Sequence, residues 1–210
     1  MITFLRRVIT PIFRRRRMLR MERLTGVGPQ TRVLDLGGSA HIWELAKARP
    51  RIRFVNIDAI IAQDTDGGRL EFTVADATMI PEPDASYDLV FSNSLIEHLY
   101  TWEAQVQFAN EARRLGNSYW IQTPARASLI EPHTFGIIGH WLPRKFQPFF
   151  VRYLTIYGWR NLPDKAMVQA FVDEHRLLNR QEMTKLFPDA KILTERFCFF
   201  PKSYIAWRKL

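Results

Sequence analysis

The chain is poor in cysteine and has no long apolar run. Its 210 residues include one cysteine, Cys198, so an internal disulfide is excluded and a reducing compartment is favoured. No uninterrupted apolar stretch approaches the ~18 residues that a transmembrane helix needs. The composition, 47% hydrophobic and 24% charged, is ordinary for a globular chain that is long enough for one domain with a sizeable core.

Acidic residues are almost absent from residues 1–23. This segment holds eight arginines and one acid, Glu22, so it accounts for +7 of the formal net charge of +9. The rest of the chain is close to neutral, and the high isoelectric point describes the N-terminal segment rather than the domain. A nucleic-acid partner is therefore disfavoured.

We expect residues 1–24 to form a basic amphipathic segment that precedes a domain at 25–210. Apolar residues recur between the arginines at helical spacing, and Thr10-Pro11 is typical of a helix start, which favours two short helices. Two interpretations stay open: residues 1–23 bind an anionic membrane surface, or they form a solvated basic arm packed loosely on the domain. The arginines leave no apolar stretch for a secretory signal. The expected location is the cytoplasm, with peripheral binding at the inner face of the membrane under the first interpretation.

The turn that could bind a nucleotide contains only two of the glycines that such turns usually have. A strand ending at Asp35-Leu36 is followed by Gly37-Gly38, and helix formers continue from Ala40 to Arg49. A strand that enters a helix through such a turn presents backbone N–H groups and a helix N-terminus at one point. Ser39 and His41 stand where a complete glycine motif would have further glycines, so an ordinary tight turn is the alternative.

Strands and helices are predicted to alternate as far as residue 124. The predicted strands are 32–36, 51–58, 70–75, 87–94 and 117–123, with helices at 40–49 and 101–115. This alternation favours an open parallel sheet covered by helices on both faces. Polar residues end five successive strands, namely Asp35, Asp58, Asp76, Asn93 and Thr123. Because ligands bind beyond the carboxyl ends of such strands, these residues outline a predicted site.

Residues 125–178 interrupt the alternation. We expect a mostly helical insertion that lies over the carboxyl edge of the sheet as a lid or substrate wall. Its run from Arg144 to Arg160 is dense in aromatic and basic residues. That run either forms the insertion's own core, or grips a lipid tail or an anionic head group, with Arg144, Lys145 and Arg152 at the rim.

The regular pattern then resumes. Asn179 is predicted to cap a helix at 180–187. Strands are predicted at 191–199 and 203–208, joined by Pro201-Lys202. Strands joined this closely must be antiparallel.

Together these motifs resemble class I S-adenosylmethionine-dependent methyltransferases over about residues 33–208. The matching segments are VLDLGG at 33–38, NID at 56–58, VADA at 74–77 and YDLVFSNSLIEH at 87–98. The resemblance implies an α/β, Rossmann-like fold with a seven-stranded, mostly parallel sheet whose last strand is antiparallel. It also implies an enzyme that uses S-adenosyl-L-methionine and releases S-adenosyl-L-homocysteine. The chain looks closest to a methyltransferase type 11-like subgroup with a Gly-Gly turn, whose members are often assigned to cell-surface glycan and lipid pathways.

The resemblance also assigns cofactor-binding residues to the strand ends. It places Gly37 and Gly38 beside the methionine part, Asp58 on the ribose hydroxyls and Asn93 near the sulfonium, and it directs Asp76 and Ala77 to the adenine. The full expected set is Asp35, Gly37, Gly38, Ser39, Asp58, Ala59, Asp76, Ala77, Asn93 and Ser94. We expect no metal, because Ser94 stands where some quinone-pathway O-methyltransferases have another acid. NAD is disfavoured because Ile42 replaces the third glycine of a dinucleotide turn.

Histidines are the candidates for removing a proton from the acceptor. His133, with Glu131 two residues before it, is predicted to be a base oriented by a carboxylate. The alternative is that this pair only pins the insertion. His98 is a weaker candidate, for which a structural hydrogen bond is favoured, and His175 is expected to be solvated.

The predicted function is methylation of a hydroxyl on a small-molecule, lipid or glycan-pathway acceptor. Transfer from a sulfonium requires alignment of the nucleophile and, for a hydroxyl, removal of its proton. The alternative is a non-catalytic methyltransferase-like module that binds a membrane or a partner enzyme. The unbroken series of polar strand ends favours the enzyme. The residues carry no signal for an oligomeric state.

Overall fold

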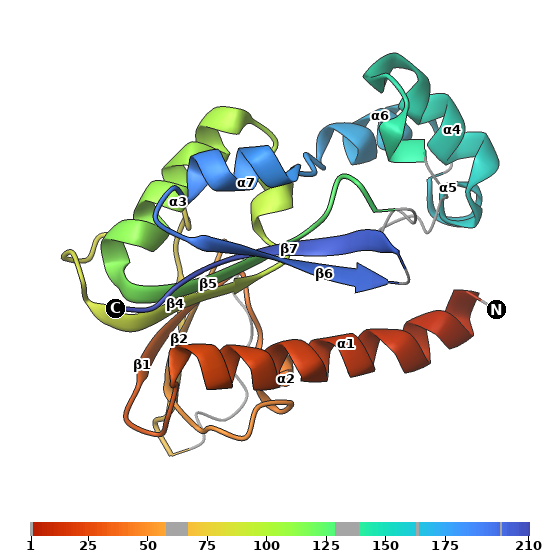
Figure 1. Ribbon diagram of the computed structural model, residues 1–210. Helices are drawn as coiled ribbons and strands as arrows, with labels where there is room; N and C mark the ends of the chain where they lie inside the picture. Colours follow the sequence, from red (N-terminus) through yellow and green to blue (C-terminus); the bar gives the residue numbers. More distant parts are fainter. Residues whose placement is uncertain (1, 58–66, 129–138, 163, 198) are drawn as a thin grey trace.

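A seven-stranded sheet forms the centre of the protein. The computed structural model describes residues 2–57, 67–128, 139–162, 164–197 and 199–210 (Figure 1). The strand order is β3-β2-β1-β4-β5-β7-β6. The strands are β1 (Arg32–Leu36), β2 (Arg51–Asn56), β3 (Leu70–Val74), β4 (Tyr87–Asn93), β5 (Gly116–Pro124), β6 (Lys191–Phe197) and β7 (Phe200–Arg208). The first five pair in parallel, whereas β7 is antiparallel to both β5 and β6, so the predicted fold is confirmed.

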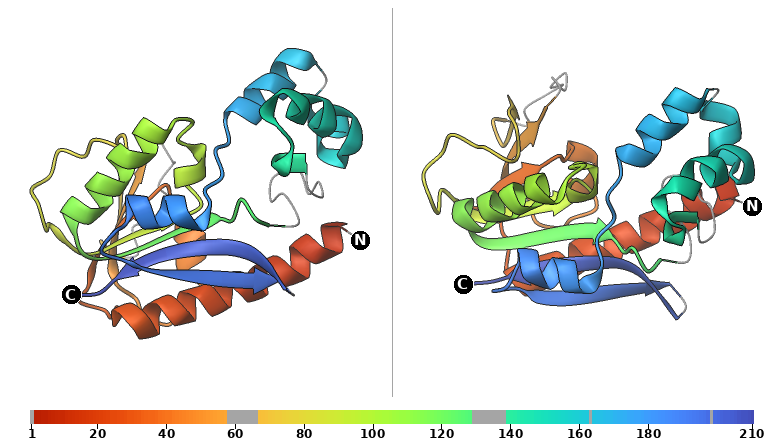
Figure 2. Two further views of the ribbon diagram at one scale, coloured as in Figure 1. Left: turned by 45° about the horizontal axis from the view of Figure 1, so that its top comes forward. Right: turned by 90° about the horizontal axis from the view of Figure 1, so that it is seen from above.

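Helices cover both faces of the sheet, and three more form the insertion (Figures 1 and 2). The covering helices are α1 (Ile2–Thr25), α2 (Ala40–Trp43), α3 (Trp102–Leu115) and α7 (Arg180–Leu186). The insertion contains α4 (Gln147–Leu154), α5 (Ile156–Asn161) and α6 (Lys165–Asp173). Short 3-10 turns are η1 (Ile96–His98), η2 (Gly139–Trp141) and η3 (Arg144–Phe146).

Alternating side chains along the strands build two separate cores. Leu34 and Val90 face α3 and α7, while Val33 and Leu89 face α1 and α2. This is the period of two that a strand buried on both faces produces. The insertion has a small core of its own, made by Val151, Leu162, Val168 and Val172.

Helix starts follow the predicted caps. The Thr101 hydroxyl accepts a hydrogen bond from the Ala104 N–H at the start of α3. Asn179 and Glu182 form a reciprocal capping box at the start of α7. Each side chain satisfies backbone N–H groups that the first helical turn leaves without partners.

The N-terminal helix is one element, and its second half belongs to the core. α1 runs without a break through Pro11, so the predicted division into two short helices is wrong. Met18 and Met21 lie on one face of the helix and are fully buried in the core between α1 and the sheet. The loose packing of a solvated arm is therefore wrong for this half of the helix. Burial of the methionine side chains outweighs the preference of the neighbouring arginines for solvent, and this keeps the second half of α1 packed on the sheet.

Predicted boundaries also move, most of all at two places. The helix predicted at 40–49 ends at Trp43, because the N–H groups of Leu45 and Ala46 bond to carbonyls three residues back and not four. The joint of the terminal hairpin lies before Phe200 rather than at Pro201-Lys202. Pro201 is tolerated in β7 because it faces the register shift in β6.

If α1 is part of the core, Met21→Ala will lower the free energy of unfolding by about 2 to 5 kcal/mol, the usual cost of emptying a buried site. The matched control on the same helix is Ile12→Ala, since the Ile12 side chain is 45% exposed. Urea denaturation of both variants measures the difference. Equal midpoints for the two variants would contradict the burial of α1.

Candidate functional site

The carboxyl ends of β1 and β4 meet at the centre of the sheet, where the strand order reverses. In open parallel sheets this reversal opens a crevice that binds ligands. The turn after β1 is compact: Gly37 has a φ of +73°, and its N–H donates to the Val55 carbonyl at 2.8 Å. A Cβ on Gly38 would lie 2.0 Å from the Asp35 carboxylate. Glycine is therefore required here, so that the backbone can pass over the acid.

Asp35 is fully buried under this turn. Its Oδ2 accepts a hydrogen bond from Trp43 Nε1 at 2.7 Å, and the Trp43 ring packs on Phe91. Its Oδ1 has no hydrogen-bond partner within the described part of the chain. Burial raises the pKa of Asp35 to about 7, although the Trp43 hydrogen bond opposes the change. A buried acid with a free oxygen is suited to a positively charged ligand.

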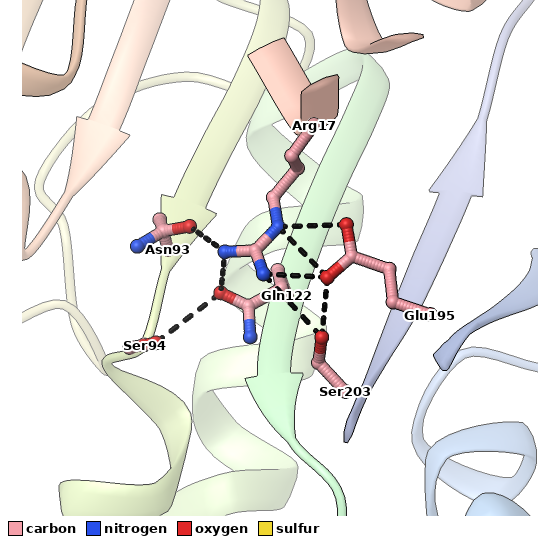
Figure 3. A network of polar contacts seen from close by, with 6 residues as sticks. All are labelled: Arg17, Asn93, Ser94, Gln122, Glu195 and Ser203. Atoms are coloured by element: carbon pink, nitrogen blue, oxygen red, sulfur yellow. Dashed lines mark hydrogen bonds and ion pairs between the residues drawn. The ribbon is translucent and has the colours of Figure 1, made fainter. Parts of the chain in front are cut away.

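Arg17 of α1 crosses to the same edge and binds groups from four strands (Figure 3). Its guanidinium bonds to Glu195 on β6, with Nη2 2.5 Å from Oε2. Nη1 donates to Asn93 Oδ1 at 2.5 Å and to Gln122 Oε1 at 2.7 Å, and Nη2 donates to Ser203 Oγ at 3.3 Å. The Arg17 side chain is only 5% exposed, so this network is an interior feature.

All five N–H groups of the Arg17 guanidinium have acceptors in this network. Burial alone would raise the pKa of Glu195, but the charge and hydrogen bonds of Arg17 outweigh it and hold that pKa below its usual value. Because no donor is left over, Arg17 holds α1 on the sheet and does not bind a ligand directly.

Asn93 and Ser94 end β4 within reach of this network. In Figure 3 the Asn93 oxygen faces Arg17, and its amide nitrogen points away. Ser94 has a φ of +65°, a conformation that side chains other than glycine seldom adopt, and its Oγ donates to Gln122 Oε1. Strained residues of this kind persist where surrounding contacts impose them, often at ligand sites. Arg17 therefore orients Asn93 directly and Ser94 through Gln122.

Lys202 on β7 is a second cation beside the network. Burial and then the charge of Arg17 lower the pKa of Lys202 to about 8, while Glu195 opposes the shift. Its Nζ lies 4.3 Å from the centroid of the Phe13 ring of α1. The carboxyl edge thus holds a group that titrates close to neutral pH, which sequence patterns did not indicate.

Three of the other predicted cofactor residues lie within the described part of the structure, and two do not. Asp76 follows β3, is exposed, and its Oδ1 accepts from the Thr78 N–H and hydroxyl, while Ala77 is buried. Ser39 is exposed at the start of α2 and makes no side-chain cap bond. Asp58 and Ala59 lie outside the described residues.

Of the three predicted catalytic candidates, only His98 lies within the described residues. Glu131 and His133 lie outside the described residues. His98 packs edge-on against the ring of His175, with centroids 4.7 Å apart. His175 is half-buried and its Nδ1 lies 2.7 Å from the Phe171 carbonyl, so the expectation that it is solvated is wrong.

A cavity of about 460 Å³ lies between the insertion and the end of β5. Aromatic and basic side chains dominate its lining, among them Arg126, Trp141, Arg144, Phe150, Phe171 and His175. The Arg176 N–H donates to the carbonyl of Glu97, in the turn after β4, which ties this wall to the sheet edge. A cavity of this size suits a small organic ligand.

The residues of the Arg17 network were missed from the sequence, except for Asn93 and Ser94. Arg17 is one arginine among eight in residues 1–23, and its charge alone does not distinguish it. Its signal is the adjacent pair Met18 and Met21, which marks the buried face of the helix. Glu195 and Ser203 face each other across β6 and β7, which becomes visible only when the strands pair.

Comparison with known proteins finds a partial match to one protein family and a shared fold with solved structures. The model of the methyltransferase domain family matches residues 25–118. Magnesium protoporphyrin IX methyltransferase of Synechocystis PCC 6803, with bound SAH, is similar over 96% of this chain and 84% of its own, with 14% identity and a TM-score of 0.59. Phosphoethanolamine N-methyltransferase 2 of Haemonchus contortus, in complex with S-adenosyl-L-methionine, is similar over 87% of this chain and 38% of its own, with 15% identity and a TM-score of 0.56.

A third similar structure is described as putative zinc-dependent alcohol dehydrogenases from Rhodobacter sphaeroides. It covers 88% of this chain and 86% of its own, with 12% identity and a TM-score of 0.53. No curated protein matches the sequence. At these identities the solved structures share the fold alone, whereas the family match covers β1 to β4, where most of the expected cofactor residues lie.

Removal of the Arg17 side chain will leave the buried carboxylate of Glu195 without its charge partner. We expect Arg17→Met to lower the free energy of unfolding by about 3 to 5 kcal/mol, because Glu195 loses its charge partner. The exposed neighbour Arg16 provides the control: Arg16→Met should change stability by less than about 0.5 kcal/mol. The double variant Arg17→Met, Glu195→Met should recover much of the loss. Identical denaturation midpoints for the two single variants would refute the role of the ion pair.

Asp35 should make stability depend on pH. Its pKa in the folded protein, about 7, exceeds its ordinary value of 3.8, so the folded state holds this proton more tightly than the unfolded state. The resulting stabilisation is complete below about pH 4 and is lost as pH rises through 7, and it is on the order of 4 kcal/mol. Denaturation of wild type and Asp35→Asn across this range isolates the effect. A constant difference between the two proteins would contradict it.

Proposed function

We propose that this chain, a class I S-adenosylmethionine-dependent methyltransferase, methylates a hydroxyl group on a small-molecule, lipid or glycan-pathway acceptor. The expected cofactor residues at the ends of β1, β3 and β4 lie within the matched family segment. The acceptor class rests on a separate observation, the cavity between the insertion and the end of β5.

The described residues fit the cofactor. S-adenosylmethionine carries an ammonium group and a sulfonium, and the buried Oδ1 of Asp35, which lacks a partner among the described residues, suits a positive charge. Gly37 and Gly38 would bring backbone groups to its methionine part, and Asn93 and Ser94 would lie near the sulfonium. Asp76 and Ala77 would contact the adenine, and Asp58 with Ala59 would contact the ribose. When bound, this cofactor supplies a methyl group that the sulfonium has already activated.

The protein must then align the acceptor, exclude water and remove a proton. Arg17 fixes the side-chain oxygens of Asn93 and Gln122, so the floor of the site is preorganised. The same network keeps α1 against the strand ends, where it covers one side of the crevice. An oriented floor of this kind lowers the entropy that the reacting groups must lose.

The cavity between β5 and the insertion is the observation that supports an organic acceptor. Trp141, Phe150 and Phe171 offer apolar surface, and Arg126 and Arg144 bring positive charge to the same wall. An acceptor with an apolar body and an anionic group would match both kinds of lining. Lipid and glycan-pathway intermediates that carry a phosphate have this character.

Two histidines can serve as the base in this proposal. His133, oriented by Glu131, is the candidate that the sequence supports. His175 is the candidate that lines the cavity: with Nδ1 donating to the Phe171 carbonyl, Nε2 is its basic nitrogen. His98 supports the His175 ring through an edge contact and does not line this cavity.

Cofactor binding is tested by isothermal titration with S-adenosylmethionine. We expect saturable binding by the wild type, and a loss of roughly tenfold or more in Asp58→Ala from removal of charged hydrogen bonds. The matched control is Asp84→Ala, because Asp84 is an exposed acid in the loop that precedes β4. Absence of binding by the intact protein would reject the enzyme and favour the non-catalytic module.

Acceptor chemistry is tested by transfer of a labelled methyl group into fractionated lysate. Label in lipid or glycan intermediates supports the proposal, and label confined to protein or nucleic acid refutes it. His133→Ala and His175→Ala are compared in the same assay, with Asp84→Ala as the control because that side chain is exposed. The variant of the true base should lose turnover by about 10²-fold or more while it keeps its affinity for S-adenosylmethionine. Full turnover by both variants would exclude a histidine base.

A further inference from the structure

The insertion exposes large aromatic side chains that its own core does not use. On α4 and α5 the exposed fractions are 63% for Phe149, 55% for Tyr153 and 74% for Trp159. Phe149 and Tyr153 lie one helical turn apart with their rings 5.0 Å apart, so they form one face of α4. Val151 points the other way, into the core of the insertion. The exposed face is therefore available to something outside the chain.

The turn between β6 and β7 adds to this surface. Phe199 is 93% exposed, and Phe200 beside it is also exposed. In Figures 1 and 2 the β6–β7 turn, the insertion and the N-terminal half of α1 lie at one end of the molecule, and the C-terminus lies at the other. The carboxyl end of β5 faces this end of the molecule, since Arg126, just after β5, lines one cavity together with residues of the insertion. We call this end the aromatic-basic end: Phe146, Phe149, Tyr153, Leu154, Trp159 and Phe199, with the cations that surround them.

Positive charge outnumbers negative charge at the aromatic-basic end, although Asp164 caps α6 and Asp173 pairs with Arg144. Residues 141–163 contain four basic residues and no acidic residue. Arg15 and Arg16 are exposed on the part of α1 that leads toward the same end. Exposed aromatic rings among cations are the composition of segments that lie in the interface of an anionic bilayer, where rings enter the boundary of head groups and acyl chains. Lipid phosphates then neutralise the cations.

We propose that the aromatic-basic end docks the protein on an anionic lipid bilayer, with the carboxyl edge of the sheet turned toward the membrane. Among the described helices, none has the length and apolar character required to cross a bilayer, so the docking is peripheral. From the sequence, membrane contact by residues 1–23 is one of two interpretations, beside a solvated basic arm. In the folded protein, contact extends over α4, α5 and the β6–β7 turn. The proposal goes beyond methyl transfer, and its test does not depend on an acceptor.

The test is co-sedimentation of the full chain with vesicles. One set contains phosphatidylglycerol and phosphatidylcholine in equal parts, and the other contains phosphatidylcholine alone. We expect binding to the anionic vesicles and at least tenfold weaker binding to the neutral ones, because each surface cation contributes about fivefold. Equal binding to both sets, or to neither, overturns the proposal.

Variants separate the aromatic contribution from that of charge. Phe149→Ser with Trp159→Ser should weaken binding to anionic vesicles by roughly tenfold for each ring removed. Leu210→Ser is the control, since Leu210 is an exposed apolar residue at the opposite end. Lys145→Gln with Arg160→Gln should weaken binding about fivefold for each charge. The control for charge is Arg49→Gln with Arg51→Gln, which lie at the amino edge of the sheet.

Two outcomes would overturn the proposal even if vesicles sediment the protein. The first is that substitution of Arg49 and Arg51 lowers binding as much as substitution of Lys145 and Arg160. The attraction would then be nonspecific, and the membrane would not contact one particular face of the protein. If a random-sequence DNA duplex at equal phosphate concentration displaces the protein from the vesicles, the surface is a general polyanion site. Titration with S-adenosylmethionine confirms that every variant is folded, because none of these residues lines the cavity or the expected cofactor site.

Discussion

The buried ion pair between Arg17 and Glu195 connects the first helix of the chain to the last strands of the sheet. Asn93, Gln122 and Ser203 complete the shell of the guanidinium, so one side chain contacts groups from β4, β5, β6 and β7. A charge pair this deep requires full hydrogen bonding, since an unpaired charge in the interior is expensive. The requirement fixes where α1 lies on the sheet. The polar groups of β4, β5, β6 and β7 on that face are positioned around the Arg17 guanidinium.

Two arrangements of charge lie side by side at this edge. Under the glycine turn, Asp35 is buried with one oxygen free of partners, which favours a cationic ligand. Beside it, Arg17 is fully neutralised by Glu195 and neutral acceptors, so its charge does not oppose that ligand as strongly as a free arginine would. Burial and the charge of Arg17 lower the pKa of Lys202 to about 8. The edge thus combines a place for positive charge with an arginine whose own charge is compensated.

The insertion contributes an inner and an outer surface. Its inner side closes the cavity at the end of β5 with aromatic and basic side chains, and its outer side presents further aromatics to solvent. Its core consists of four aliphatic residues with Tyr157 and Phe171 packed against them, whereas Phe149, Tyr153 and Trp159 are exposed. A membrane-docked orientation would bring the cavity toward acceptors that reside in or on the bilayer. The two proposals are therefore compatible, although each stands on its own residues.

The order of the strands along the chain and the polar residues at their ends can be predicted from the residues alone. Those features are local: a strand that is buried on both faces needs an apolar run, and a turn over an acid needs glycine, as Gly37 and Gly38 illustrate. The helix caps at Thr101 and Asn179 are local for the same reason. In contrast, the packing of the elements selects which of eight N-terminal arginines is buried, and it brings His175 to a cavity. Such partnerships join residues as distant as 17 and 195, and they arise from the packing of separate elements, which no periodicity along the chain records.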